Sequence, residues 1–294
     1  GTATGRTLVT DIENLTASPY GWHDTDGSPG AEYTITRGNN AHAYDDSGNN
    51  NSSQGDEPDA GSSLSFDYSA NLNASPSSNN AFRGYNLNSN ITNVFYMTNM
   101  MHDIYYNYGF DEVAGNFQQN NYGKGGEGGD YVKVEAQDGG GTNNANFSTP
   151  ADGTSGRMQM YLWTSGSPQI DGDLDNGIIA HEFGHGIHTR LGGGPNNSGC
   201  MQNDEQQGEG WADWFGLMVT IEPNDLGTDG RGIGTFAINQ PVTGSGIRTH
   251  KYSTNMSANP HTYNDIKVES LPHGVGSVWC AMLWDLTWAY VDKY

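Results

Sequence analysis

The segment His181-Glu182-Phe183-Gly184-His185 constrains this chain of 294 residues more than any other part of it. Histidines four residues apart lie on the same face of an α-helix, so both imidazoles can reach one ion. The glutamate between them lies one residue round the helix, beside that ion. This is the HExxH pattern, in which zinc and a carboxylate base act together. The segment therefore predicts a helix that carries a zinc site.

The flanking residues favour a helix over residues 176–191. Apolar side chains recur at helical spacing and can form one buried face, namely Ile178, Ile179, Phe183 and Ile187. Acidic residues precede this stretch, where they suit the positive end of a helix dipole. Glycines and a proline follow it at 192–195, where they end helices. A core helix with two structural histidines is the alternative interpretation.

A zinc site of this kind needs a third protein ligand. A further histidine shortly after the second would be one solution, but Leu191 stands at that position. Residues 209–213 offer another, because Glu209 and Asp213 are four apart and share a helix face. Glu209 would bind the metal, and Asp213 would accept the free N–H of one ligand histidine and orient its ring. Two solvated carboxylates on an acidic surface are the alternative.

Longer segments resemble the fungalysin-type zinc metallopeptidases, within the thermolysin-like group. The similarity covers roughly the last two thirds of the chain, whereas the first 80 residues match loosely. The matching segments are 93–120, 136–163, 171–214, 252–256, 259–263 and 273–286. The resemblance implies a secreted endopeptidase that hydrolyses internal peptide bonds of proteins.

The resemblance also implies an α+β fold with two lobes and a central zinc-binding helix. We expect a β-rich N-terminal lobe over residues 1–191, which includes the HEFGH helix. We expect a mainly helical C-terminal lobe over residues 192–294, which stops earlier than the family's C-terminal lobe usually does. The active site would lie between the two lobes.

Residue roles follow from the same resemblance. The family's zinc ligands and general base match residues already singled out, His181, His185, Glu209 and Glu182. Asp213 matches the carboxylate that orients a ligand histidine, and His273 matches a histidine that stabilises the oxyanion. Asn144 and Ala145 resemble the edge strand that holds the substrate backbone by β-augmentation. A tyrosine would assist the oxyanion, and both Tyr252 and Tyr263 lie in family-like motifs.

Charge and hydropathy limit the partners. The chain has 12 basic and 34 acidic residues and a net charge of −22, which argues against binding nucleic acid or anionic membranes. It contains no apolar run long enough for a transmembrane helix. The start Gly-Thr-Ala is typical of a mature terminus from which a signal peptide has gone. We expect a secreted monomer that acts on protein or peptide substrates. The resemblance to fungalysins further implies a zymogen with an N-terminal inhibitory propeptide.

Two further features are ambiguous from the sequence. Cys200 and Cys280 could form one disulfide in an exported protein or remain buried free thiols. Aspartates in glycine-rich loops offer the oxygen ligands that Ca²⁺ prefers, and they lie at positions 24/26, 45/46, 56/59 and 171/173/175. The last group lacks the ligand spacing of an EF-hand. Structural Ca²⁺ of another kind is therefore an expectation.

The remaining periodicity predicts the other elements. Strands are expected at residues 7–9, 33–36, 64–68, 131–136, 145–148 and 157–163, and helices at 90–108, 205–221 and 275–291. The stretches 46–80 and 222–262 read as loops, and the glycine-rich residues 123–129 as a turn. On the helix at 90–108, the adjacent His102 and Asp103 are typical of a structural hydrogen bond rather than a catalytic pair.

Overall fold

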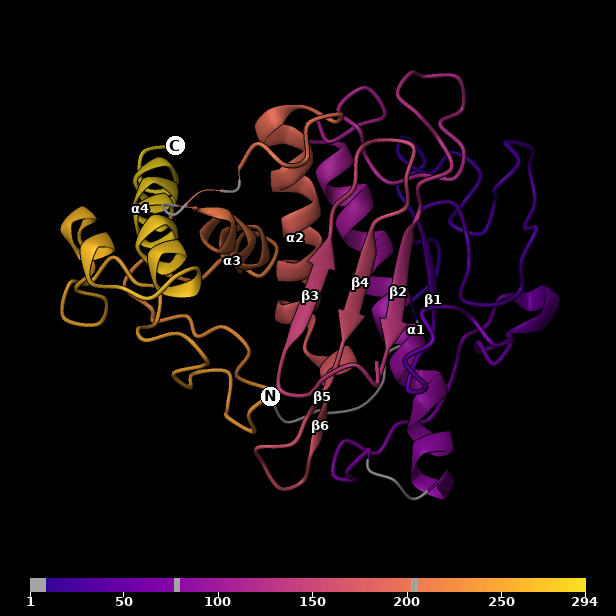
Figure 1. Cartoon of the computed structure of the whole chain (residues 1–294), viewed down its shortest axis with the longest axis horizontal. Coiled ribbons are helices and arrows are strands. Elements are labelled where there is room, and N and C mark those ends of the chain that lie inside the picture. The colour runs from indigo at the N-terminus through magenta and orange to yellow at the C-terminus, as the bar shows by residue number, and fades with distance from the viewer. Residues whose placement is uncertain (1–8, 77–79, 202, 204–205) are drawn as a thin grey trace.

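The computed structural model of the protein describes residues 9–76, 80–201, 203 and 206–294. A four-stranded sheet has the order β1-β2-β4-β3 (Figure 1). Strands β1 (Ala41–Asp45), β2 (Val132–Ala136) and β4 (Arg157–Met160) run parallel, and β3 (Ala145–Ser148) pairs antiparallel with β4. Strand β3 therefore forms one edge of the sheet.

The sheet has one apolar and one polar face. Side chains that alternate along β2 and β4 are apolar and fully buried in the main core, including Val132, Val134, Met158 and Met160. Helix α1 (Asn80–Tyr106) covers this face and contributes Ile91, Val94 and Met101 to the same core. The intervening strand residues are polar, namely Lys133, Glu135, Arg157 and Gln159. Because successive side chains of a strand point to opposite faces of the sheet, these polar side chains lie on the face away from α1.

Helix α2 (Asn176–Gly193) carries HEFGH and lies beside the edge strand β3 (Figure 1). A short hairpin of β5 (Leu162–Trp163) and β6 (Ile170–Asp171) and the 3₁₀ turn η2 (Gly172–Leu174) lead into it. It begins at Asn176 because the Asp175 carboxylate accepts the backbone N–H groups of Gly177 and Ile178, both at 3.1 Å. It ends where Gly194 adopts a φ of 87°. The predicted helix at 176–191 is confirmed.

Two further helices complete the layer beside α2. Helix α3 (Gly208–Met218) lies between α2 and α4 (His273–Val291), and the 3₁₀ helix η3 (Tyr263–Lys267) precedes α4 (Figure 1). Helices α3 and α4 approach very closely at two glycines. A Cβ at Gly210 would lie 2.2 Å from the carbonyl oxygen of Gly276. This contact brings the first turn of α4 against the first turn of α3.

Several predicted elements differ from the structure. The helix predicted at 90–108 begins earlier, at Asn80, and the one at 205–221 is shorter, although residues 204–205 lie outside the described part. The strand predicted at 157–163 divides into β4 and β5. Residues 33–36 form only an isolated bridge at Ile35, and residues 64–68 are irregular after the turn η1 (Gly61–Ser63). Residues 7 and 8 of the first predicted strand are not described. The fold is mixed α/β, with more loop before α1 than expected.

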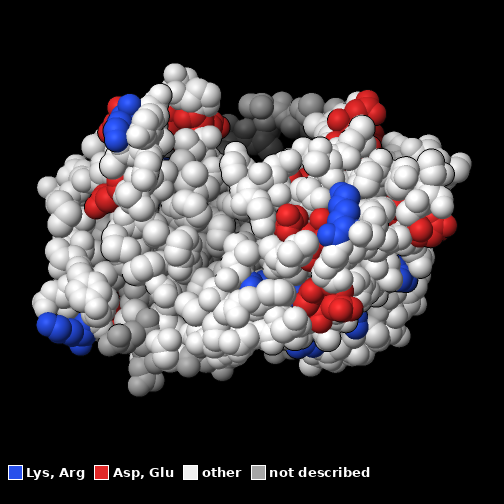
Figure 2. All heavy atoms as spheres, turned by 90° about the horizontal axis from the view of Figure 1, so that it is seen from above, with Lys and Arg blue, Asp and Glu red and all other residues white. Residues whose placement is uncertain are grey.

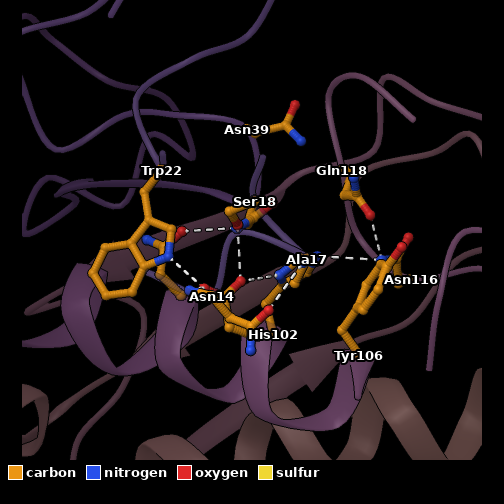
Figure 3. A network of polar contacts seen from close by, with 12 residues as sticks. Asn14, Ala17, Ser18, Trp22, Asn39, His102, Tyr106, Asn116 and Gln118 are labelled. Atoms are coloured by element: carbon orange, nitrogen blue, oxygen red, sulfur yellow. Dashed lines mark hydrogen bonds and ion pairs between the residues drawn. The ribbon is translucent and has the colours of Figure 1, made fainter. Parts of the chain in front are cut away.

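Buried polar groups fix the N-terminal segment on α1 (Figure 3). The Asp103 carboxylate accepts hydrogen bonds from the Asn14 backbone N–H at 2.9 Å and from Ser18 Oγ and Trp22 Nε1 at 2.8 Å. His102 Nδ1 lies 2.9 Å from the same carboxylate. The structural hydrogen bond predicted for His102 and Asp103 is confirmed. The bonds from Asn14, Ser18 and Trp22 to the same carboxylate anchor a long loop that has little regular structure of its own.

The acidic residues do not form one continuous patch on the face shown in Figure 2, where they lie in several separate groups among uncharged residues. None of the helices in the described part of the chain is long and apolar enough to cross a membrane. Cys200 is exposed and Cys280 is buried, and both are free thiols. The disulfide considered between them is therefore wrong: Cys280 is fully enclosed on α4, whereas Cys200 lies at the surface beyond the end of α2.

Candidate metal centre

Three predicted ligands converge between α2 and α3. His181 Nε2 lies 3.1 Å from His185 Nε2 and 3.3 Å from Glu209 Oε2, and His185 Nε2 lies 3.7 Å from Glu209 Oε1. Ligand atoms about 2.0–2.1 Å from a tetrahedral metal ion are roughly 3.3 Å from each other. The two nitrogens and the carboxylate oxygens therefore have the chemistry and the spacing that Zn²⁺ requires.

Asp213, one turn after Glu209 on α3, lies behind the cluster. Its Oδ1 is 2.7 Å from His181 Nδ1, which leaves Nε2 of that ring to face the other ligands. Burial alone would raise the pKa of Asp213. The Arg248 guanidinium and the His181 ring outweigh burial and hold that pKa well below its usual range. Asp213 is thus a carboxylate hydrogen-bonded to the His181 ring; its role in orienting a metal ligand stays a prediction.

Arg248 and Tyr252 also bind Asp213, and neither contact was predicted. Arg248 Nε and Nη2 donate to the two carboxylate oxygens at 2.8 and 2.9 Å, and Tyr252 O–H donates to Oδ2 at 2.5 Å. Both come from the loop between α3 and η3, which has no periodicity to indicate contacts. The small number of basic residues, 12 in the chain, was the one available signal, because a buried carboxylate such as Asp213 needs a cation nearby.

The two tyrosines considered for the oxyanion lie elsewhere. Tyr252 is 1% exposed and its hydroxyl is occupied by Asp213. Tyr263 is 75% exposed and borders a separate pocket beside α4. Neither side chain lines the cleft in front of the three ligands.

Glu182 is buried beside the three ligands at the base of the cleft. Its Oε2 has no hydrogen-bond donor among the described residues. Burial is the largest influence on its pKa and raises it; His181 opposes this and Glu209 adds to it, giving a pKa of about 7. A buried carboxylate with an open acceptor, next to a metal-type cluster, is placed to accept a proton.

The remaining predicted residues line the same cleft, which has a volume of about 590 Å³. His273, at the first position of α4, has a side chain that is 53% exposed, and its Nε2 lies 3.4 Å from Glu209 Oε2. Asn144 and Ala145 form the opposite wall at the start of edge strand β3. The structure therefore brings together in one cleft residues from three regions of the sequence.

The acidic loop residues considered for Ca²⁺ have different surroundings. Asp175 caps α2, and Asp171 Oδ2 accepts hydrogen bonds from Asn90 at 2.6 Å and Gln137 at 2.5 Å. In the described residues, carboxylates form metal-type clusters at two of the other predicted positions, 24/26 and 46, each with further acidic partners. These are Asp24 with Asp26 and Glu32, and Asp46 with Glu135 and Asp138.

Two imidazoles from one helix and a carboxylate from the next face a cleft with a buried glutamate, which is the arrangement expected of a metallopeptidase's metal centre. A profile of the Fungalysin metallopeptidase (M36) family matches residues 1–294, and the chain belongs to this family. It is 43% identical over 292 residues to Extracellular metalloproteinase 2 of Trichophyton tonsurans, covering 98% of this chain and 44% of the relative.

Two other relatives give the same result. Extracellular metalloproteinase 2 of Arthroderma gypseum is 42% identical over 292 residues, covering 98% of this chain and 44% of the relative. Extracellular metalloproteinase 3 of Trichophyton tonsurans is 43% identical over 280 residues, covering 95% of this chain and 42% of the relative. The chain thus spans less than half the length of the curated relatives it matches.

Proposed function

We propose that this chain is the catalytic part of a secreted zinc endopeptidase that hydrolyses internal peptide bonds of proteins. The observation that carries the proposal is the convergence of His181, His185 and Glu209 beside the buried Glu182, in a cleft bordered by an edge strand. We further propose the two-lobe, thermolysin-like arrangement, with residues 1–191 and 192–294 as the lobes and α2 between them.

His181, His185 and Glu209 would hold the metal ion. Zinc bound there would supply the positive charge that polarises a peptide carbonyl and makes water acidic. Glu182 would take the proton from the attacking water and return it to the leaving amine, because its side chain lines the same cleft and its Oε2 has no donor among the described residues. His273, whose Nε2 lies 3.4 Å from Glu209 Oε2, would donate to the oxygen that becomes negative. Asp213 would keep the His181 ring in the tautomer and orientation that this requires.

Asn144 and Ala145 would bind the substrate backbone. Strand β3 pairs with β4 on one side only, so its other edge can add an extended peptide as a further strand. A peptide that extends along an edge strand in both directions past the metal would be cut internally. This supports an endopeptidase rather than an enzyme that releases terminal residues.

The relatives are named extracellular metalloproteinases, which supports secretion of this protein as well. We also propose maturation from a zymogen with an N-terminal inhibitory propeptide, action as a monomer, and protein or peptide substrates. The strongly acidic composition supports partners other than nucleic acid or anionic membranes.

The test compares three variants of the zinc-loaded protein. Glu182→Gln is expected to retain zinc and to lose casein cleavage by about 10²–10⁴-fold, since the proton acceptor is gone. Glu209→Ala is expected to lose zinc. Glu222→Gln, on an exposed loop, serves as the matched control and should keep both. Casein cleavage at the native rate by Glu182→Gln would remove Glu182 as the base, and full zinc content in Glu209→Ala would remove Glu209 as a ligand.

A further inference from the structure

A second carboxylate cluster lies on the polar face of the sheet, made by Asp46, Glu135 and Asp138. Asp46 directly follows β1, Glu135 lies in β2, and Asp138 lies in the turn after β2. Ligand-type oxygens of the three lie within 4.8 Å of one another. The three residues are 1%, 0% and 2% exposed. This cluster contains no imidazole or thiol, so its chemistry is that of hard oxygen donors.

The charge of the cluster is not matched by its protein neighbours. Its nearest described cation is Arg157, whose Nη1 is 3.7 Å from Glu135 Oε2, too far for a hydrogen bond. The same guanidinium donates to Asn51 through Nη1 and to Gln159 through Nη2. Three buried carboxylates therefore share one distant, partly exposed guanidinium. Buried charges are stable only when they are paired or bind a metal ion.

A separate observation concerns one oxygen of Glu135. Its Oε1 accepts a hydrogen bond from Tyr44 O–H at 3.2 Å, whereas its Oε2 is buried and has no donor in the part of the chain described. Burial, only partly opposed by Arg157 and reinforced by Asp46, raises the pKa of Glu135 to about 7. An acceptor in this position needs either a proton or a cation.

We propose that Asp46, Glu135 and Asp138 form a Ca²⁺ site. Ca²⁺ takes carboxylate oxygens in flexible geometry, and several carboxylates in one site raise its affinity. Asp46 already accepts backbone N–H groups of Asn50 and Asn51, at 2.9 and 3.1 Å, which orders the loop on the solvent side. The ion ties the end of β1, the middle of β2 and the turn after β2 together. It stabilises the sheet whose far edge is β3, and it is independent of the proposed peptidase chemistry.

The other acidic cluster of this type supplies a matched control. Asp24, Asp26 and Glu32 have a similar spacing, but Asp26 and Glu32 are exposed. Hydrogen bonding does not separate the two clusters: Asp24 accepts Gly27 N–H at 3.1 Å and Tyr122 O–H at 2.8 Å, and Asp138 likewise accepts Gly140 N–H at 2.6 Å and Gln159 Nε2. The difference lies in the exposure of Asp26 and Glu32. Water can solvate the two exposed members, so this cluster has no comparable need for a cation.

The experiment titrates CaCl₂ into the zinc-loaded full chain at constant ionic strength, by calorimetry and by thermal melting. MgCl₂ is titrated in parallel. The wild type is expected to bind one Ca²⁺ at this site and to melt at higher temperature. Glu135→Gln is expected to weaken Ca²⁺ binding by at least about tenfold, through loss of one ligand charge. Asp26→Asn should keep the wild-type response. If Glu135→Gln does not fold, Asp138→Asn takes its place.

Two outcomes would overturn the site. One is the absence of any Ca²⁺ heat or stabilisation in the wild type, which would mean that the carboxyl groups share protons instead. The other is a response that survives Glu135→Gln and disappears in Asp26→Asn. Zinc content and casein cleavage are measured on the same samples. If the zinc-loaded wild type did not cleave casein but kept its Ca²⁺ response, the proposed function would be contradicted and the Ca²⁺ site would not.

Discussion

The molecule contains two buried histidine–aspartate pairs that look alike in isolation. His181 Nδ1 lies 2.7 Å from Asp213, and His102 Nδ1 lies 2.9 Å from Asp103. Each pair lies on or between helices, and each aspartate accepts several further hydrogen bonds. One pair borders the candidate metal centre, and the other holds the N-terminal loop on α1 (Figure 3). The difference between them therefore comes from the surroundings.

The second ring nitrogen separates the two pairs. His102 Nε2 lies 3.2 Å from Asn116 Nδ2, so both nitrogens of that ring are used in a sealed polar network. His181 Nε2 instead faces His185 Nε2 and Glu209 Oε2, which are themselves metal-ligand atoms. A carboxylate that orients a histidine is thus common to both sites. A function is indicated only where the other nitrogen meets further ligands at the edge of a cleft.

The largest expected effect comes from removing the charge in the sealed pair. Asp103→Asn should lower the free energy of unfolding by about 3 kcal/mol, because it breaks a buried, charge-assisted network. The new amide also places a donor opposite Trp22 Nε1 or Ser18 Oγ, which donate to Asp103 in the wild type. Denaturant unfolding measures the loss. Zinc affinity of the folded variant should stay within about twofold of the wild type; a larger change would mean that the two pairs are coupled.

The matching change in the cleft should act on the metal instead. Asp213→Asn is expected to lower zinc affinity by about 10–100-fold, since partners that orient metal-bound histidines have effects of this size. That corresponds to roughly 1.4–2.7 kcal/mol. Competition with a chelator measures it, with Asp103→Asn as the control. If Asp213→Asn kept the wild-type zinc affinity, the role of this carboxylate would be to bind Arg248 and Tyr252 and not to orient the His181 ring.

Sequence patterns predicted those parts of the site that lie on periodic elements. The spacing of His181, His185, Glu209 and Asp213 indicated shared helix faces, and the structure has these residues on α2 and α3. Arg248 was missed because it lies in a long loop, where no period relates a residue to its spatial neighbours. The pairing of Cys200 with Cys280 was wrong for a similar reason, since sequence gives their number but not their burial.

The fold, like the site, was predictable from the sequence only where residues follow a helical or strand period. Strand β3 was predicted with its observed bounds because apolar Ala145 and Phe147, which pack against the core, alternate with polar residues. Residues 33–36 have a strand-like composition, yet the structure gives Ile35 only an isolated bridge to Asp59. The loops before α1 are held by hydrogen bonds to side chains such as Asp103 rather than by backbone hydrogen bonds between paired strands. Contacts of that kind depend on the tertiary arrangement and leave no local pattern.

The smallest expected effect is a pH dependence that isolates the charge of Asp103. Burial would raise the pKa of Asp103, but hydrogen bonds from His102, Trp22 and the Asn14 backbone hold it below its usual value. A depressed carboxyl pKa contributes stability above the pKa of the unfolded chain, about 3.9, and that stability is lost as pH falls through the lower folded value. The difference in unfolding free energy between the wild type and Asp103→Asn should therefore be constant from pH 7 to about 5 and shrink below about pH 4. The substitution leaves the proposed zinc ligands unchanged in both proteins, so any acid release of zinc should cancel in the difference. A difference that stays constant down to pH 3 would mean that the packing of Asp103, and not its charge, holds the N-terminal loop.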